Sequence, residues 1–303
     1  MKLIVDTDPG VDDVIAIALA KALDDCALLG VTTVFGNTHV SQSSRNARYL
    51  MDLLEWDVPV HQGAALPHGE STYSPSSDVH GPEGFGARTS VLEIGQNGPE
   101  TAAEFLVEMA REHVGELVIC AIGPLTNIAD ALRLDPEFSR NVKDVVIMGG
   151  ALTCPGNITP YAEANIFHDP KAADTVFSSP LNLTMVGLDV TLKTLLRQSQ
   201  IDEIADHAPR IGNFLSEITP FYLEFYQRVA GIDGCPMHDA AAVLACFHAD
   251  RFTYHKTGVQ VALDGETIGQ TLPADKRKDV AVAIDIDSSW AIETLLGRLK
   301  TLD

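Results

Sequence analysis

The stretch that decides the fold is LIVDTDPGVDD, residues 3–13. It begins as a short apolar run typical of a strand and passes through Pro9-Gly10 into a segment of helical periodicity. Similar apolar runs alternate with helical segments as far as Val190, which is the pattern of β-α units around a parallel sheet. We therefore expect an α/β fold: an open, mostly parallel central sheet flanked by helices, with a Rossmann-like core and extra C-terminal helices and strands.

The expected strands are residues 3–5, 28–34, 58–61, 117–121, 144–148 and 183–186. The helices expected between them are residues 11–23, 41–54, 101–113, 125–133 and 170–177, several of which follow Asp, Asn or Ser caps. Later residues predict helices at 201–207, 211–229, 239–247 and 290–299, with β-like runs at 258–263 and 280–285. Two irregular stretches, 63–88 and 231–236, lack the features of a linker, so we expect one domain over residues 1–303.

The composition indicates a cytoplasmic protein that acts on small molecules. A chain of 303 residues with 46% hydrophobic side chains can bury a large core, and its net charge of −21 repels nucleic acid and anionic membranes. No apolar run approaches the roughly 18 residues of a membrane span, and the first residues do not resemble a signal peptide. The cysteines form neither a disulfide framework nor a zinc motif, so each is expected to be a small buried side chain; they are Cys26, Cys120, Cys154, Cys235 and Cys246.

Four aspartates, Asp6, Asp8, Asp12 and Asp13, fall within eight residues behind the first strand. The carboxyl end of a parallel strand is where open α/β sheets bind ligands. Helix capping explains one or two of these side chains. Like charges about 4 Å apart repel by about 4 kcal/mol at an effective dielectric near 20, and a folded chain relieves this with a cation or with protons. Because only oxygen ligands are in view, we expect a hard cation, Ca²⁺ or Mg²⁺.

The pattern Asp-x-Asp-Pro-Gly-x-Asp-Asp resembles the signature of the nucleoside hydrolases of the inosine-uridine-preferring type, which cleave the N-glycosidic bond of ribonucleosides. Further similar motifs follow in family order over nearly the whole chain: Gly36-Asn37, Gly123-Pro124-Leu125-Thr126-Asn127, Met148-Gly149-Gly150, Gly156-Asn157, Glu163-Ala164-Asn165 and His238-Asp239. The resemblance implies a ribonucleoside substrate, a role in nucleoside salvage, and a homodimer or homotetramer.

The resemblance also implies a Ca²⁺ ion held by Asp8, Asp13, the backbone carbonyl of Ile122, and Asp239. These positions lie at strand ends or at a helix start, where one crevice can gather them. In the implied reaction the ion activates a water, and Asp8 acts both as a ligand and as the general base that takes the proton.

For the ribose, the resemblance implies a hydrogen-bonding cradle of Asp12, Asn157, Glu163 and Asn165, with Met148 packed beneath the ring. Such contacts could convert sugar-binding energy into orientation at the anomeric carbon. Turn and cap chemistry is the structural alternative for Asn157, Glu163 and Asn165, and core packing is the alternative for Met148.

Two histidines are candidates near the nucleobase. His238 matches the family's acid for the leaving group, although a lone histidine is more often structural. His80 lies in a segment that resembles the family loop His-Gly-x-Asp-Gly-Leu-Gly, but here Glu83 replaces the Asp and Phe85 replaces the Leu. These departures leave the geometry of the His80 loop open.

Tyr222 and Tyr226 are spaced i, i+4, so both project from one face of a helix. By the resemblance they line the base pocket with Asn37, and two tyrosines there indicate the broad inosine-uridine enzymes; core packing is the alternative.

The sequence leaves three other functions open. One is a hydrolase restricted to pyrimidine nucleosides. A second is a Mg²⁺ phosphatase of the haloacid-dehalogenase type, because a strand followed by Asp-x-Asp also resembles that nucleophile loop, although the usual Asp-Gly-Thr continuation is missing. A third is a protein that binds nucleosides, or senses Ca²⁺, without catalysis.

Overall fold

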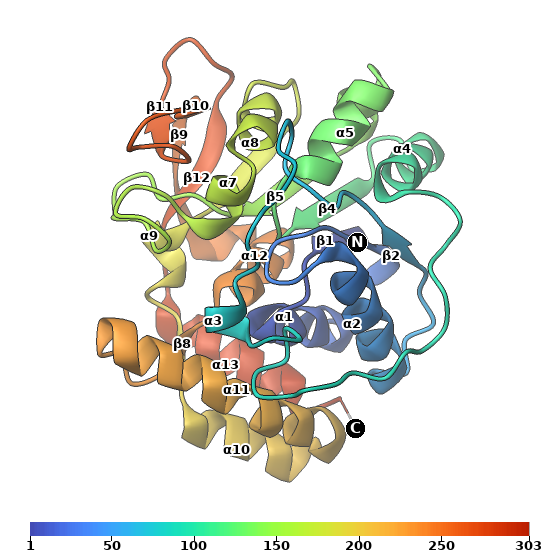
Figure 1. Cartoon of the computed structure of the whole chain (residues 1–303), viewed down its shortest axis with the longest axis vertical. Coiled ribbons are helices and arrows are strands. Elements are labelled where there is room, and N and C mark those ends of the chain that lie inside the picture. The colour runs from blue at the N-terminus through green and yellow to red at the C-terminus, as the bar shows by residue number, and fades with distance from the viewer. Residues whose placement is uncertain (303) are drawn as a thin grey trace.

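An eight-stranded sheet runs through the centre of the molecule (Figure 1). The structure is a computed structural model and describes residues 1–302. The strand order is β3-β2-β1-β4-β5-β6-β12-β9, and neighbouring strands are parallel except for the antiparallel pair β12 and β9. The strands of this sheet are β1 Lys2–Thr7, β2 Ala27–Thr33, β3 Val60–Gln62, β4 Leu117–Ala121, β5 Asp144–Met148, β6 Leu183–Val186, β9 Phe252–Thr257 and β12 Val280–Ile286. The expected α/β fold with a Rossmann-like core is confirmed.

Helices cover both faces of the sheet, with α4, α5 and α8 on one side and α1, α11, α12 and α13 on the other (Figure 1). Their bounds are α1 Val11–Ala22, α2 Val40–Leu53, α3 Ser77–His80, α4 Ala102–Glu112, α5 Thr126–Leu134, α6 Phe138–Asn141, α7 Ala164–His168, α8 Pro170–Phe177, α9 Leu188–Thr191, α10 Gln198–His207, α11 Pro209–Ala230, α12 His238–Phe247 and α13 Ser288–Leu299. Two short pairs, β7 Leu195–Leu196 with β8 Cys235–Pro236 and β10 Val259–Val261 with β11 Thr271–Pro273, lie outside the main sheet.

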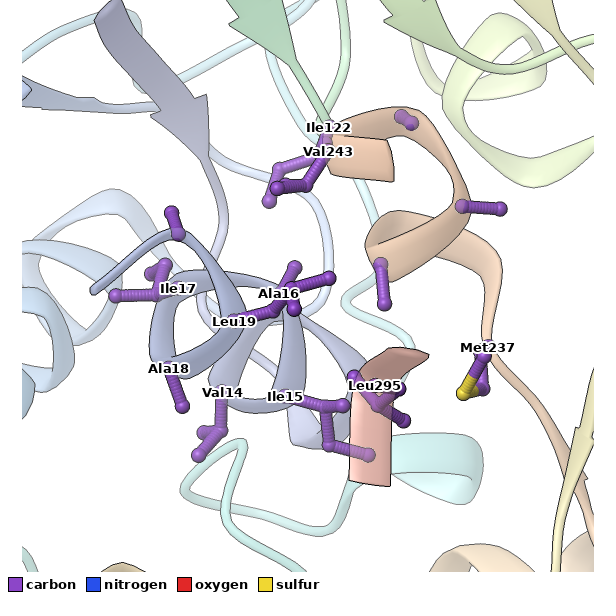
Figure 2. Close-up of a cluster of buried hydrophobic side chains, with 14 of the residues drawn as sticks. Val14, Ile15, Ala16, Ile17, Ala18, Leu19, Ile122, Met237, Val243 and Leu295 are labelled. Atoms are coloured by element: carbon purple, nitrogen blue, oxygen red, sulfur yellow. The ribbon is translucent and has the colours of Figure 1, made fainter. Parts of the chain in front are cut away.

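The alternation of side chains in β1 builds two hydrophobic cores. Leu3 and Val5 pack on the face covered by α1, and Ile4 packs on the opposite face among residues of α4 and α5. Helix α1 is buried on nearly all sides, and Figure 2 shows its side chains beside Val243 of α12 and Leu295 of α13. Residues 6–13, which hold the four aspartates, are called the acidic turn below. The helix that starts within this turn is therefore held firmly in the interior.

The chain reverses its direction across the sheet between β1 and β4. From β1 it proceeds to β2 and β3 on one side, whereas β4, β5 and β6 follow on the other. Such a switch point leaves a crevice at the carboxyl ends of the strands. Asp8 follows β1 and Ile122 follows β4, and the Ile122 N–H donates to the Asp6 carbonyl at 2.8 Å.

The edge strand β9 was not predicted from the sequence, because its alternating pattern FTYHKT contains no continuous apolar run. The expected strand 258–263 is only partly correct, since β10 is shorter and pairs with β11 outside the main sheet. The irregular stretch 63–88 contains the one-turn helix α3, and the irregular stretch 231–236 ends in β8. The single-domain assignment stays a prediction.

The five cysteines are free thiols. Cys120 and Cys235 are buried as expected, but Cys26, Cys154 and Cys246 are only half-buried, so the expectation of five buried side chains was wrong for these three. In residues 1–302, no helix has both the length and the apolar composition needed to cross a membrane.

Candidate active site

Asp8 lies at the end of β1 and is completely buried. Its Oδ2 accepts a hydrogen bond from the Asn37 N–H at 2.7 Å, whereas its Oδ1 has no hydrogen-bond partner among the described residues. Glycines allow the carboxylate to fit, because a Cβ on Gly36 would lie 2.0 Å from Oδ2 and a Cβ on Gly123 would lie 2.7 Å from Oδ1. Burial, followed by the nearby charge of Asp13, raises the pKa of Asp8 well above its usual range.

Three further carboxylates gather beside Asp8. Asp12, Asp13 and Asp239 each offer a carboxylate oxygen, and these oxygens lie within 4.8 Å of one another. Burial raises the pKa of both Asp12 and Asp13 to about 6, and burial together with the charges of the other three aspartates raises the pKa of Asp239 well above its usual range. A cation at this position would relieve the repulsion.

Asp13 is oriented by the turn that precedes α1. The Gly10 N–H donates to its Oδ2 at 2.8 Å, the Asn37 side-chain amide donates to the same oxygen at 3.2 Å, and the Thr7 hydroxyl donates to its Oδ1. Asp239 is presented from the first turn of α12. The clustered carboxylates therefore come from the end of β1 and the starts of two buried helices.

Asn165 joins the ends of β4 and β5. Its side-chain amide donates to the carbonyl oxygens of Ile122 at 3.0 Å and Met148 at 3.1 Å. A carbonyl oxygen has two lone pairs, so the Ile122 carbonyl can still accept a cation. Glu163 caps α7, with Oε1 accepting from the Asn165 N–H and Oε2 from the Gly150 and Ile166 N–H groups, all within 3.2 Å. Burial raises the pKa of Glu163 to about 7.

These groups line or underlie a cavity of about 460 Å³, a volume in the range of small-molecule sites. Asp12, Asp239, Glu163 and Asn165 are among its polar lining residues. None of the described residues that line the cavity is Lys or Arg. The cavity therefore suits a neutral, hydroxyl-bearing molecule and a cation better than an anion.

One wall of the cavity is aromatic. The rings of Tyr222 and Tyr226 lie edge to face with centroids 5.0 Å apart, and the Tyr222 hydroxyl donates to Asp12 Oδ2 at 3.1 Å. Phe225, from the same helix, and Ile232 complete this wall. The expected shared face of the two tyrosines is confirmed, with apolar surface suitable for stacking.

Both ring nitrogens of His238 contact hydroxyl groups. Nε2 lies 2.8 Å from the Tyr226 hydroxyl oxygen and Nδ1 lies 2.7 Å from the Thr191 hydroxyl oxygen. Burial, and secondarily the nearby His80, lowers the pKa of His238 to about 3, so the ring is neutral near pH 7. Its one N–H donates to one hydroxyl, and its other nitrogen accepts from the second.

His80 lies against the acidic turn. Its Nδ1 accepts from the Val11 N–H at 3.2 Å and lies 3.7 Å from Asp12 Oδ1, and its ring stacks on Tyr222 with centroids 5.2 Å apart. Burial lowers the pKa of His80 to about 4. Because Nδ1 is an acceptor, the proton of the neutral ring is on Nε2.

The structure brings nearly all the predicted site residues to this cavity. The predicted residues that line it are Asp12, Asn37, His80, Ile122, Met148, Asn157, Glu163, Asn165, Tyr222, Tyr226, His238 and Asp239. Asp8 and Asp13 lie just beneath this lining and are fully buried. Asn157 is at the exposed rim, where its Oδ1 accepts from the Ala164 N–H at 3.0 Å.

Sequence reasoning missed several wall residues. Phe225 carried a usable signal, because it lies three residues after Tyr222 on the same helix. Thr191, the partner of His238, carried none, since it lies 47 residues away and only the fold joins them. The same holds for Leu192 and Ile158 at the rim of the cavity.

Comparison with known proteins identifies the relatives of this chain. The sequence model of the inosine-uridine preferring nucleoside hydrolase family matches residues 3–292 of this chain. The chain is 35% identical to probable uridine nucleosidase 2 of Arabidopsis thaliana, over 98% of this chain and 97% of the relative. It is 33% identical to the inosine-uridine preferring nucleoside hydrolase of Leishmania major, over 96% and 95% of the two chains. A solved purine-preferring ribonucleoside hydrolase from Gardnerella vaginalis superposes with a TM-score of 0.95 at 34% identity, covering 100% and 99% of the chains.

Proposed function

The chain belongs to the inosine-uridine preferring nucleoside hydrolase family, whose members hydrolyse N-glycosidic bonds, and from this premise we propose that it uses a Ca²⁺ site to cleave both purine and pyrimidine ribonucleosides. One observation carries the proposal: four buried carboxylates meet at a cavity that also has an aromatic wall. The phosphatase alternative is set aside, because it explains neither this family match nor the aromatic wall.

The donors fit a hard cation. Asp8, Asp13 and Asp239 with the Ile122 carbonyl would hold Ca²⁺ through oxygen atoms alone, the ligand type that Ca²⁺ takes in proteins. The unpartnered Oδ1 atoms of the buried Asp8 and Asp12 support a missing positive partner. Asp12 belongs to the close carboxylate cluster, so it can share the ion or bind a sugar hydroxyl beside it.

When bound, Ca²⁺ supplies electrostatic orientation and a lowered pKa to a water molecule. Asp8 is placed to accept a proton, because its Oδ1 has no hydrogen-bond partner among the described residues. An oxocarbenium-like transition state requires attack on one face of the ribose and departure of the base on the other. Asp8 in the carboxylate cluster would serve the attack, and His238, which contacts Tyr226 of the aromatic wall, would serve the departure of the base.

The ribose would lie beside the carboxylates. Asp12, Glu163, Asn165 and Asn157 offer hydrogen-bonding groups along its hydroxyls, and Met148 offers an apolar surface beneath the ring. These contacts hold the anomeric carbon in place and exclude water from the buried side. Asn157, Glu163 and Asn165 are each tied to backbone groups and Met148 ends a strand, which supports a preorganised sugar site.

The aromatic wall would hold the nucleobase. Tyr222, Tyr226 and Phe225 present flat apolar surfaces that suit either base size, which supports a broad enzyme over a pyrimidine-restricted one. Because the His238 ring is neutral near pH 7, it would first take up a proton from solvent and then deliver that proton to the departing base, with Tyr226 in hydrogen-bond contact with its Nε2. Asn37 binds Asp8 and Asp13 from the cavity wall, so its main contribution is to orient the carboxylates.

The proposal extends to cellular context. We infer a cytoplasmic enzyme of nucleoside salvage that works as a homodimer or homotetramer, with a small-molecule ribonucleoside as its partner. Free thiols at all five cysteines are what a reducing compartment favours. Analytical ultracentrifugation of the full chain distinguishes the two assemblies from a monomer.

The direct test is incubation of the purified protein with inosine and uridine, with and without EDTA. We expect free hypoxanthine and uracil, and loss of both activities after chelation. Release of uracil alone would indicate the pyrimidine-restricted enzyme. Nucleoside binding without release of base would indicate the non-catalytic protein.

A further inference from the structure

The loop that carries His80 is docked on α2 by polar side chains. This segment, residues 80–86, is called the His80 loop below. Arg45 forms an ion pair with Glu83 at 2.7 Å, and the Gln42 side-chain amide donates to the same carboxylate at 3.1 Å and to the Pro82 carbonyl at 3.2 Å. Glu83 stands where the family pattern has Asp, and its longer side chain reaches both partners on α2.

Asn46 connects this loop to the acidic turn. It is completely buried, and its Nδ2 donates to two backbone carbonyls, that of Glu83 at 2.8 Å and that of Pro9 at 3.2 Å. Pro9 follows Asp8 directly and precedes the turn that orients Asp13. One amide group therefore bridges two segments that face the cavity from far apart in the sequence.

The orientation of the Asn46 amide is determined by its partners. Nδ2 uses both of its hydrogens on carbonyls, and Oδ1 accepts from Arg45 Nη2 at 3.0 Å and from Arg45 Nε at 3.3 Å. The reversed amide would place an oxygen against two carbonyl oxygens. Arg45 therefore holds the loop twice, through Glu83 directly and through Asn46.

The loop and the turn touch with no room between them. Gly84 has a φ of +82°, and a Cβ there would lie 2.7 Å from the Pro9 carbonyl and 2.9 Å from Asn46 Nδ2. On the other side, the buried Phe85 packs edge to face on Phe214 of α11, with ring centroids 5.2 Å apart. The loop is thus clamped between α2, the acidic turn and α11.

We propose that Asn46 is a positioning residue that joins the acidic turn to the His80 loop, and that Arg45 and Glu83 hold it there, so that His80 keeps its place against Asp12 and Tyr222. The inference rests on the proposed function, because it gives His80 a role at the nucleobase. Asn46 does not line the cavity. It acts through His80.

A double-mutant cycle tests this coupling. Asn46→Ala should lower kcat/KM for inosine by about tenfold to a hundredfold, the scale of a small misplacement near the reacting groups. In the His80→Ala background the same change should cost less than about threefold, because residues that act as a unit are not additive. Equal losses in both backgrounds would overturn the proposal.

The matched control is Arg48→Gln. Arg48 lies on the same helix and holds a different loop, donating to the Ile94 carbonyl at 2.8 Å and to Glu93 at 2.9 Å, away from the cavity. Its replacement should leave kcat/KM within about twofold. If Asn46→Ala does not fold, Glu83→Gln replaces it in the cycle, with an expected loss of about threefold to tenfold that vanishes in the His80→Ala background.

A second readout does not depend on activity. The imidazole NMR resonance of His80, assigned by its loss in His80→Ala, should shift in Asn46→Ala and stay in place in Arg48→Gln. An unchanged His80 resonance in folded Asn46→Ala overturns the positioning role even if nucleosides are cleaved. Absence of nucleoside cleavage by the wild-type chain, with a shifted resonance, would instead reject the proposed function and leave the positioning role supported.

Discussion

The Nε2 of His238 lies 2.8 Å from the hydroxyl oxygen of Tyr226, although the two residues come from different helices. The Thr191 hydroxyl holds the other ring nitrogen at 2.7 Å. The imidazole is therefore fixed beside the aromatic wall of the cavity and is part of a chain of groups that can pass a proton.

His238→Ala should slow hydrolysis of inosine by about 10²-fold or more, the usual contribution of general acid catalysis. A substrate such as p-nitrophenyl riboside leaves as a stable anion and should be far less affected. Steady-state kcat on the two substrates measures the difference. Tyr226→Phe is the matched variant, since it keeps the ring and removes only the hydroxyl.

Equal losses on both substrates would assign His238 a different role. It would then shape the cavity or support its neighbour Asp239, and proton donation would pass to Tyr222, Tyr226 or His80.

Protein purified without chelator should contain Ca²⁺ at about one ion per chain, because the donors are carboxylate and carbonyl oxygens. Its removal should lower both activity and melting temperature, since an ion bound only by the folded state stabilises that state. Metal analysis and thermal unfolding before and after EDTA check this. Stoichiometric zinc without calcium would contradict the ligand set.

His168 predicts a pH dependence of stability outside the carboxylate cluster. Burial lowers its pKa to about 4, and its Nδ1 has no hydrogen-bond partner in the described chain. Because the unfolded state binds the proton more readily, this residue lowers stability as the pH falls below about 6.5. By pH 5 the cost reaches up to about 2 kcal/mol.

His168→Phe keeps an aromatic ring beside Tyr73 and removes the titration. The variant should therefore lose less unfolding free energy than the wild type between pH 7.5 and pH 5. Urea unfolding of both proteins at the two pH values measures how much unfolding free energy each one loses. An equal loss of unfolding free energy in the variant and the wild type would mean that His168 titrates in the folded protein as it does in the unfolded chain.

Asn127 should stabilise the folded state next to the site. Its Nδ2 donates to Asp6 Oδ1 at 2.7 Å and to the Thr33 carbonyl at 3.0 Å, and its Oδ1 accepts from the Ala64 N–H at 2.9 Å. Asn127→Ala leaves the Ala64 N–H without this partner, while Asp6 Oδ1 keeps its bond from Thr32 and the Thr33 carbonyl keeps its bond from the Gly63 N–H. The variant should therefore cost about 1–3 kcal/mol in urea unfolding. The exposed Asn182, which donates to the Lys143 carbonyl, is the control, and its alanine variant should lose less than about 1 kcal/mol.

The parallel sheet could be predicted from the sequence, because its strands are buried and therefore appear as continuous runs of apolar residues. Helix α8 and strand β6 have the predicted bounds, Pro170–Phe177 and Leu183–Val186. The acidic turn was visible because its residues are contiguous. Strand β9 was not visible, since its polar side chains alternate at the sheet edge.

The site was less predictable where partners are distant in the chain. The contact between His238 and Thr191 spans 47 residues, and that between Tyr222 and Asp12 spans 210. The docking of the His80 loop depends on Asn46, whose position within an amphipathic helix carries no sign of function. Local patterns indicate which residues carry chemistry, and tertiary packing decides which of them meet.

The most direct test of the account is kcat for nucleoside hydrolysis by Asp8→Ala with Ca²⁺ present, compared with the wild type on inosine and uridine. In the proposed mechanism Asp8 is both a metal ligand and the proton acceptor, so its loss should lower kcat by at least about 10³-fold on both substrates. Circular dichroism and metal analysis of the same sample establish that the variant is folded and loaded. A folded, Ca²⁺-loaded variant that retains a tenth of the wild-type kcat would contradict the account.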